Sequence, residues 1–172
     1  MNDKAAIIGR RSKAEGAFWE ETIEKACAYY SAAGLAEIQK TPEPMRPIRS
    51  LGNGKFIAHF SKMAQPDYKG TLKGGRAIVF EAKHTDKDRM LQSVISSEQE
   101  KELNKHLALG AECRVLVSFD FKRYFFIPWE VFRDMKARYG RKYIKPDDIP
   151  EYEIRYCGVL LFLGSMQEVN ND

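Results

Sequence analysis

The segment AIVFEAKHT, residues 77 to 85, decides the fold. Its first four residues, Ala77 to Phe80, are apolar and predict a strand that enters a hydrophobic core. Glu81 and Lys83 follow, and because side chains alternate between the two faces of a strand, both point to the same face. A charged group is costly in a core unless it is paired or bound. This strand is therefore predicted to carry part of a site.

A second carboxylate is predicted to meet this strand. Asp67 lies fourteen positions before Glu81, in QPDYKG, and Gly74-Gly75 supplies a turn between them. If the chain folds back there as an antiparallel pair, the two carboxylates converge beside Lys83. Two carboxylates and a backbone carbonyl, such as that of Ala82, are hard oxygen ligands that suit Mg²⁺. Lys83 would then lie beside the attacking water or the charged transition state of a metal-assisted reaction on phosphate.

This arrangement has a recognised spacing. Pro66-Asp67 and, after thirteen residues, Glu81-Ala82-Lys83 form the pattern of the PD-(D/E)XK nuclease superfamily. The pattern is short, and an Asp before a turn together with an ion pair on an exposed strand gives the same letters. A nuclease site and a surface ion pair both stay open at this point.

Two more polar residues are candidates for the same site. Glu20 is expected on the apolar side of a helix from Lys13 to about Ala33, where a carboxylate is costly unless it is paired or bound to metal. Gln99 is expected on the inner side of a helix from Ser96 to Leu109. Ser96 and Gln99 also have the spacing of a capping box, so Gln99 is predicted to act in the cap, in the site or in both.

The remaining segments predict a single α/β domain over residues 1–172, with a mixed sheet. A basic arm or hairpin is expected to protrude at about 41–64, because three prolines exclude a helix and a central strand and Gly52-Asn53-Gly54 favours a turn. Further strands are predicted at about 35–40, at 67–83 as a pair, within 113–128 as a pair, and at 152–156 and 158–164, with a short helix at 131–139.

Charge and composition limit the partners and the compartment. The net charge is only +4, but the stretch from Lys40 to Lys62 has five basic residues against one acid, and Lys122 to Lys145 has eight against two. Such segments favour a polyanion such as nucleic acid, although solvated faces give the same composition. No apolar run approaches a membrane span, and three isolated cysteines favour a reducing compartment, so a cytoplasmic protein is expected. The residues predicted to contact DNA are Arg46, Arg49, Lys55, Lys62, Lys69 and Lys73.

From about Gly16 to Gly164 the chain resembles the RecU-type Holliday junction resolvases, a family that also has compact versions in phages. The resemblance rests on several blocks in the same order, which together are more specific than the short nuclease pattern. These blocks are GAFWEETIEKACAYYSAAGLAEIQKTPEP, QPDYKG, IVFEAKHT, EQEKELNKHLALGAECRVLVSF and YFFIPWE.

The resemblance implies a restriction-endonuclease-like fold with a protruding basic stalk that enters the centre of a four-way DNA junction. It implies a homodimeric endonuclease of DNA recombination and repair that depends on Mg²⁺, for which Mn²⁺ substitutes, and that cuts two opposed strands symmetrically. Recombination proteins are further potential partners. The implied metal-binding residues are Asp67, Glu81, Gln99 and Gln65, and Lys83 is the implied transition-state group.

The chain also departs from this family. Gln65-Pro66 stands where the family usually has threonines, so a hydroxyl role there is lost, and Glu98-Gln99 replaces a His-Gln pair. The arm before Gly16 is short, which puts N-terminal DNA contacts in doubt. The alternatives are another PD-(D/E)XK nuclease, restriction-like or fork-specific, and a non-catalytic DNA-binding module. The arm speaks against the first, and carboxylates that would repel phosphate speak against the second.

Overall fold

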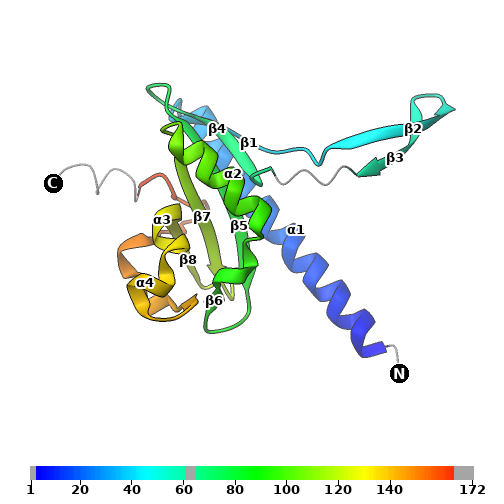
Figure 1. Cartoon of the computed structure of the whole chain (residues 1–172). Helices are drawn as coiled ribbons and strands as arrows, with labels where there is room; N and C mark the ends of the chain where they lie inside the picture. Colours follow the sequence, from blue (N-terminus) through cyan, green and yellow to red (C-terminus); the bar gives the residue numbers. More distant parts are fainter. Residues whose placement is uncertain (1–2, 61–64, 165–172) are drawn as a thin grey trace.

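A computed structural model describes residues 3–60 and 65–164 of the chain. A six-stranded sheet forms its centre, with helix α1 along one face and helices α2, α3 and α4 on the other (Figure 1). The helices are α1 (Asp3–Ala32), α2 (Ser97–Ala108), α3 (Trp129–Arg133) and α4 (Met135–Tyr139). The strands are β1 (Ala36–Lys40), β2 (Met45–Gly52), β3 (Lys55–Phe60), β4 (Tyr68–Leu72), β5 (Ala77–Thr85), β6 (Met90–Leu91), β7 (Glu112–Phe119), β8 (Arg123–Pro128), β9 (Tyr143–Ile144) and β10 (Glu153–Ile154).

The central sheet is mixed, as predicted. Its strand order is β1-β4-β5-β7-β8-β10, and β5 and β7 are parallel while the other neighbours are antiparallel. A parallel pair needs a long crossover connection, and helix α2 provides it between β5 and β7. The crossover places the start of α2 beside the strand that carries Glu81.

The sheet separates two hydrophobic cores, one on each of its faces. On one face, α1 packs its buried stripe against Phe80 of β5. On the other, α2, α3 and α4 pack over Val79 of β5 and its neighbours on β7 and β8. Because side chains alternate, Glu81 follows Val79 toward α2, whereas Ala82 follows Phe80 toward α1. The buried stripe of α1 consists of Trp19, Ile23, Ala26, Cys27 and Tyr30.

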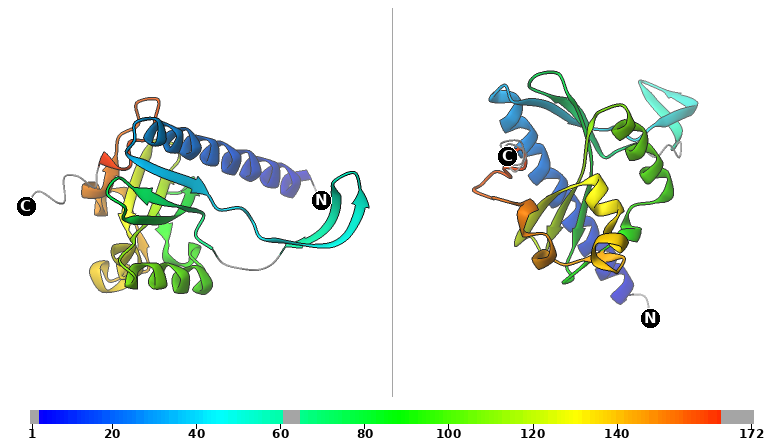
Figure 2. Two further views of the ribbon diagram at one scale, coloured as in Figure 1. Left: turned by 90° about the horizontal axis from the view of Figure 1, so that it is seen from above. Right: turned by 60° about the vertical axis from the view of Figure 1, so that its left-hand side comes forward.

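The predicted arm is a hairpin of β2 and β3 that pairs with no strand of the central sheet among the described residues. It extends away from the body, and the N-terminal part of α1 projects past the same side of the sheet (Figures 1 and 2). Its turn is Gly52-Asn53-Gly54, in which all three residues have positive φ (81°, 50° and 74°), a conformation that glycine and asparagine tolerate. Lys62 lies outside the described residues.

Three elements differ from the prediction. Helix α1 begins at Asp3 instead of Lys13, and the helix expected at 131–139 is two short helices that meet at Asp134. The segment 158–164 is no strand: the hydroxyl of Tyr30 accepts from the backbone N of Leu163 (3.0 Å) and donates to the carbonyl of Leu160 (3.3 Å). These backbone groups bond to a side chain and not to a sheet.

In the two described ranges, no helix is both long and apolar enough to cross a membrane.

Candidate active site

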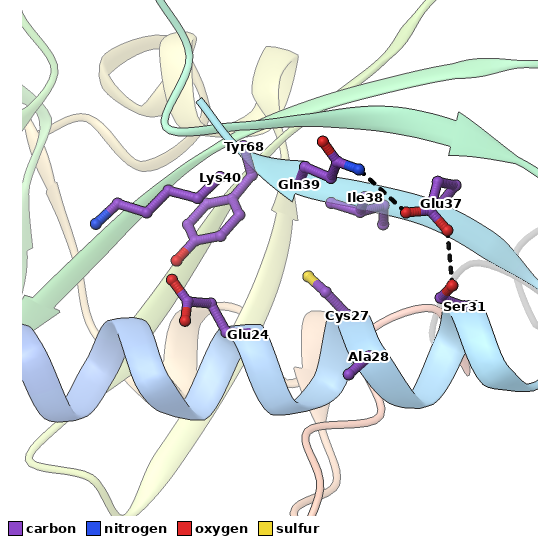
Figure 3. A pocket seen from close by; sticks show the side chains of 9 residues that line it. All are labelled: Glu24, Cys27, Ala28, Ser31, Glu37, Ile38, Gln39, Lys40 and Tyr68. Atoms are coloured by element: carbon purple, nitrogen blue, oxygen red, sulfur yellow. Dashed lines mark hydrogen bonds between the residues drawn. The ribbon is translucent and has the colours of Figure 1, made fainter. Parts of the chain in front are cut away.

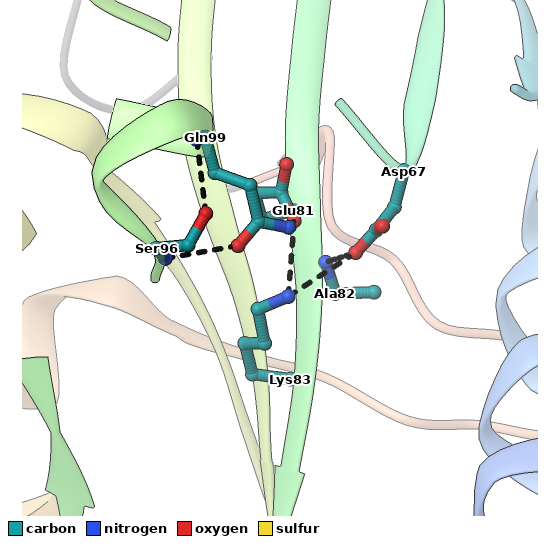
Figure 4. Close-up of polar contacts among 6 residues, drawn as sticks. All are labelled: Asp67, Glu81, Ala82, Lys83, Ser96 and Gln99. Atoms are coloured by element: carbon teal, nitrogen blue, oxygen red, sulfur yellow. Dashed lines mark hydrogen bonds and ion pairs between the residues drawn. The ribbon is translucent and has the colours of Figure 1, made fainter. Parts of the chain in front are cut away.

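Three elements bring four polar side chains together (Figure 4). Asp67 immediately precedes β4, Glu81 and Lys83 lie on β5, and Gln99 lies in the first turn of α2. The last residue pair between β4 and β5 is Tyr68 with Phe80, so Asp67 comes to lie beside the segment that starts at Glu81. The turn at residues 74–75 therefore brings the carboxylates of Asp67 and Glu81 together, as predicted.

Lys83 is the centre of the charge distribution in the site. Its Nζ is 3.0 Å from Glu81 Oε2 and 3.5 Å from Asp67 Oδ2. Asp67 Oδ2 also accepts a hydrogen bond from the backbone N of Ala82 (2.9 Å). One ammonium thus balances two carboxylates that would otherwise repel each other.

Glu81 is fully buried, and its two carboxylate oxygens differ in their contacts. Oε2 accepts from Lys83 and from Gln99 Nε2 (2.5 Å). Oε1 is buried and has no hydrogen-bond partner among the described residues. Burial, followed by the negative charge of Asp67, raises the pKa of Glu81 to about 8, although Lys83 opposes the shift. An unpartnered oxygen in a carboxylate of raised pKa is suited to a bound cation.

The donor set fits a hard divalent ion such as Mg²⁺. Within the described ranges no group of three or more His, Cys, Asp and Glu side chains lies together, so Asp67 and Glu81 are the acidic groups of this cluster that could serve as ligands. Ala82 lies past the last β4–β5 pair, and its N–H points to Asp67. Because the N–H and C=O of one residue point to the same edge of a strand, the Ala82 carbonyl faces the same space. Water molecules would complete the coordination.

Gln99 contacts the site and also caps its helix. Its side-chain oxygen accepts from the backbone N of Ser96 (3.1 Å), and its backbone N donates to Ser96 Oγ (3.2 Å). Its Nε2 donates to Glu81. The capping role of Gln99 is therefore confirmed, and the same side chain contacts Glu81, while its predicted role in metal binding stays a prediction.

Glu20 does not lie on the buried side of α1, so that prediction is wrong. Trp19 occupies the stripe, and a helix turns by about 100° per residue, which carries the next side chain away from the core. The carboxylate of Glu20 is 50% exposed and forms an ion pair with Lys40 (2.6 Å). A role for Glu20 in the site stays a prediction.

Gln65 and those predicted DNA-binding residues that the structure describes lie in three regions: beside Asp67, in the turn after β4, and on the hairpin. Gln65 Oε1 accepts from Lys69 Nζ (2.9 Å), and Lys69 lies two positions after Asp67 on the same strand face. Lys73 lies at the opposite end of β4, in the turn to β5. The other described members, Arg46, Arg49 and Lys55, are exposed on the hairpin.

A cavity of about 320 Å³ lies between α1 and β1, away from this cluster (Figure 3). Tyr68 and Glu24 point toward each other across it, and Cys27 and Ile38 form part of its wall. Tyr68 faces α1, whereas Asp67, one residue earlier, faces α2. The cavity and the carboxylate cluster are thus on opposite faces of the sheet.

A family model described as RecU, Recombination protein U, matches residues 14–169. The chain belongs to the RecU family. A protein of Pediococcus pentosaceus named Holliday junction resolvase RecU is 30% identical over 166 residues, which are 87% of this chain and 78% of that protein. A protein of the same name from Streptococcus gordonii is 32% identical over 110 residues, so the match spans only about half of its length (54%).

The RecU match includes the hairpin and all four side chains of the cluster. A solved structure of Hjc, a Holliday junction resolvase from Archaeoglobus fulgidus, is similar in fold, with a TM-score of 0.51 and 14% identity. The match covers 85% of this chain and 98% of Hjc. It confirms the predicted fold class, a restriction-endonuclease-like mixed sheet flanked by helices.

Proposed function

We propose that this member of the RecU family is a metal-dependent DNA endonuclease that resolves four-way junctions in recombination and repair. The observation that carries the proposal is the buried Glu81 oxygen that has no hydrogen-bond partner in the described part of the chain, beside Asp67 and Lys83. A site that only binds DNA has no use for two carboxylates near phosphate. The names of the relatives support the choice of a Holliday junction as substrate.

The chemistry follows from the positions of the side chains. Asp67, Glu81 and the carbonyl of Ala82 would hold Mg²⁺ or Mn²⁺, and the ion would supply positive charge at phosphate and a water of lowered pKa. Lys83 lies between the carboxylates, where its ammonium can donate to the attacking water or to a phosphate oxygen. Lys69, on the same face as Asp67, can contact the DNA backbone beside the site.

The hairpin supplies preference for a junction in this proposal. Its basic residues project outward, and a four-way junction concentrates phosphates at its centre. A homodimer would place two sites on opposed strands and give symmetric cuts. In this proposal the protein is one domain, and the hairpin is its stalk insertion at about 41–64.

The test compares cleavage of a synthetic four-way junction and a matched linear duplex, with and without Mg²⁺. Asp67→Asn and Glu81→Gln should each abolish cutting of the junction. Binding should be retained or become tighter, because each change removes a negative charge near phosphate. Glu21→Gln is the matched control, since Glu21 is exposed on α1 and pairs with Lys25.

Near-normal cutting by either site variant would contradict the site assignment. Equal cutting of duplex and junction by the unmodified protein would favour a different nuclease of this fold. Junction binding without any cutting, in either Mg²⁺ or Mn²⁺, would favour a DNA-binding module.

A further inference from the structure

The start of helix α2 is joined to Glu81 through one amide group (Figure 4). Two hydrogen bonds join Ser96 and Gln99. The backbone N of Ser96 donates to Gln99 Oε1, and the backbone N of Gln99 donates to Ser96 Oγ. These bonds form a capping box. The other end of the same amide, Nε2, donates to Glu81 Oε2. The helix cap and the carboxylate are thus held by one side chain.

The capping box determines which end of the amide faces Glu81. A backbone N–H can only donate, so the amide atom that faces the backbone N of Ser96 is the oxygen. The NH₂ group of Gln99 is then directed at Glu81 Oε2, which accepts its hydrogen bond. If the amide were turned over, two donors would meet at Ser96 and two acceptors would meet at Glu81.

This orientation also distinguishes the two oxygens of Glu81. Oε2 receives Gln99 Nε2 and Lys83 Nζ, while Oε1 has no partner in the described ranges of the chain. With two donors on one oxygen, the carboxylate is held against rotation. Oε2 is thus occupied by hydrogen bonds within the protein, and Oε1 is left to bind a ligand.

We propose that Ser96 is a positioning residue of the nuclease site. Through the capping box it holds the Gln99 amide, and that amide fixes Glu81 so that Oε1 meets the divalent metal. Gln99 acts here as a donor to Glu81 through Nε2, while its oxygen accepts from the backbone N of Ser96. The inference rests on the proposed function and assigns a residue outside the ligand set.

Substitutions at Ser96 separate the parts of the capping box. Ser96→Ala deletes the hydroxyl acceptor. Ser96→Pro also deletes the N–H that holds Gln99, and the backbone suits it: φ is −72° at Ser96, and Ile95 is extended (φ −95°, ψ 121°). Ser96→Thr keeps both groups. Ser97→Ala makes the same chemical change one residue later, outside the capping box.

The measurement is binding of Mn²⁺ to the DNA-free protein by electron paramagnetic resonance, with thermal unfolding recorded in EDTA. Ser96→Ala and Ser96→Pro should weaken Mn²⁺ binding by up to about 10-fold, the lower end of the range for direct partners of metal ligands, because Ser96 acts on Glu81 through Gln99. Ser96→Thr and Ser97→Ala should each bind Mn²⁺ with the affinity of the unmodified protein. Junction cleavage should show a matching increase in the Mg²⁺ concentration that it requires.

A cap with a purely structural role would lower the Tm of Ser96→Ala and leave its Mn²⁺ affinity unchanged at temperatures well below Tm. That result would overturn the inference while the unmodified protein still binds Mn²⁺ and cuts junctions. An unmodified protein that neither binds Mn²⁺ nor cuts would overturn the inference and the proposed function together.

Discussion

At the scale of single residues, Glu81 makes the stability of the metal-free protein depend on pH. Its pKa is about 8 in the folded chain against an ordinary value of 4.5, chiefly because of burial and then because of Asp67. The folded state therefore holds a proton that the unfolded state releases between these values, and stability falls as pH rises from about 4.5 to 8. Glu81→Gln removes this loss.

We therefore expect the free energy of unfolding to be higher for Glu81→Gln than for the unmodified protein. The difference should be small near pH 5 and should grow toward pH 8. Denaturant unfolding in EDTA at several pH values measures it, with Glu21→Gln as the control. Added Mg²⁺ should narrow the difference at high pH, because a bound cation favours the ionised carboxylate. A difference that does not change with pH would contradict the burial of Glu81 as an ionisable group.

Lys83→Ala should slow junction cleavage by about a hundredfold or more, the scale expected for a group that assists proton transfer or stabilises a transition state. Metal binding should change much less, since Lys83 is no ligand. Single-turnover cleavage across a range of Mg²⁺ concentrations checks this. A variant that regains full rate simply with more Mg²⁺ would indicate an indirect structural role.

The sequence was sufficient to place Asp67, Glu81 and Lys83, because strand alternation and one turn between two strands determine their positions. It was insufficient for Glu20, because a shift of one residue around a helix moves a side chain from the core to solvent, and Trp19 sets that phase. The orientation of the Gln99 amide also required coordinates, since it depends on the donor at Ser96 and the acceptor at Glu81.

At the scale of elements, β1 and β4 pack too closely for a side chain at Gly70. A Cβ built there would lie 2.0 Å from the carbonyl oxygen of Glu37 and 2.6 Å from Cα of Ile38, both backbone atoms. Gly70→Ala should lower the unfolding free energy by about 1–3 kcal/mol, as overpacking does. Gly16→Ala, in open space on α1, should instead raise it by up to about 1 kcal/mol.

Denaturant unfolding of both variants measures these changes. Equal stabilities of Gly70→Ala and the unmodified protein would mean that β1 separates from β4 at little cost.

Elements with a strong periodic pattern and a clear end were predictable from the sequence. The pairs β4–β5 and β7–β8 and helix α2 have such patterns, and Gly34 ends α1 near the expected place with φ of 64°. The apolar run at 158–164 was misleading, because Leu160 and Phe162 alternate as in a strand but reach the core without joining the sheet. A periodic pattern reports burial, and burial alone does not specify backbone pairing.

At the scale of the whole molecule, the sequence indicated a mixed sheet but not its strand order. Short turns join β4 to β5 and β7 to β8 and can be recognised locally, whereas the parallel β5–β7 pair depends on how α2 crosses the sheet. The two-stranded sheet of β6 and β9 joins segments more than fifty residues apart and has no local signal. The hairpin was predictable because prolines and a Gly-Asn-Gly turn act over a few residues.

The hairpin is the part that can be removed with the least effect on the body. Its strands are exposed, and Met45 pairs with Phe60 at its base, so the two ends lie side by side. Deleting residues 45–60 and joining the ends with a short Gly-Ser link should leave the protein folded with the carboxylate cluster intact. If the hairpin probes the junction centre, the shortened protein should lose its preference for junction over duplex.

Competition binding with unlabelled duplex measures that preference, and light scattering compares the oligomeric state of the shortened and the intact protein. Junction affinity should also depend less steeply on salt, because phosphate contacts from Arg46, Arg49 and Lys55 are removed. Replacing these three residues by Gln in the full-length chain is the milder matched variant, since it keeps the hairpin and removes its charge. If the shortened protein keeps the oligomeric state of the intact one and still selects junctions as well, the hairpin has no part in selection. If the intact protein is the proposed dimer and the shortened one is a monomer, the exposed apolar side chains of the hairpin, such as Ile48 and Phe56, act between subunits.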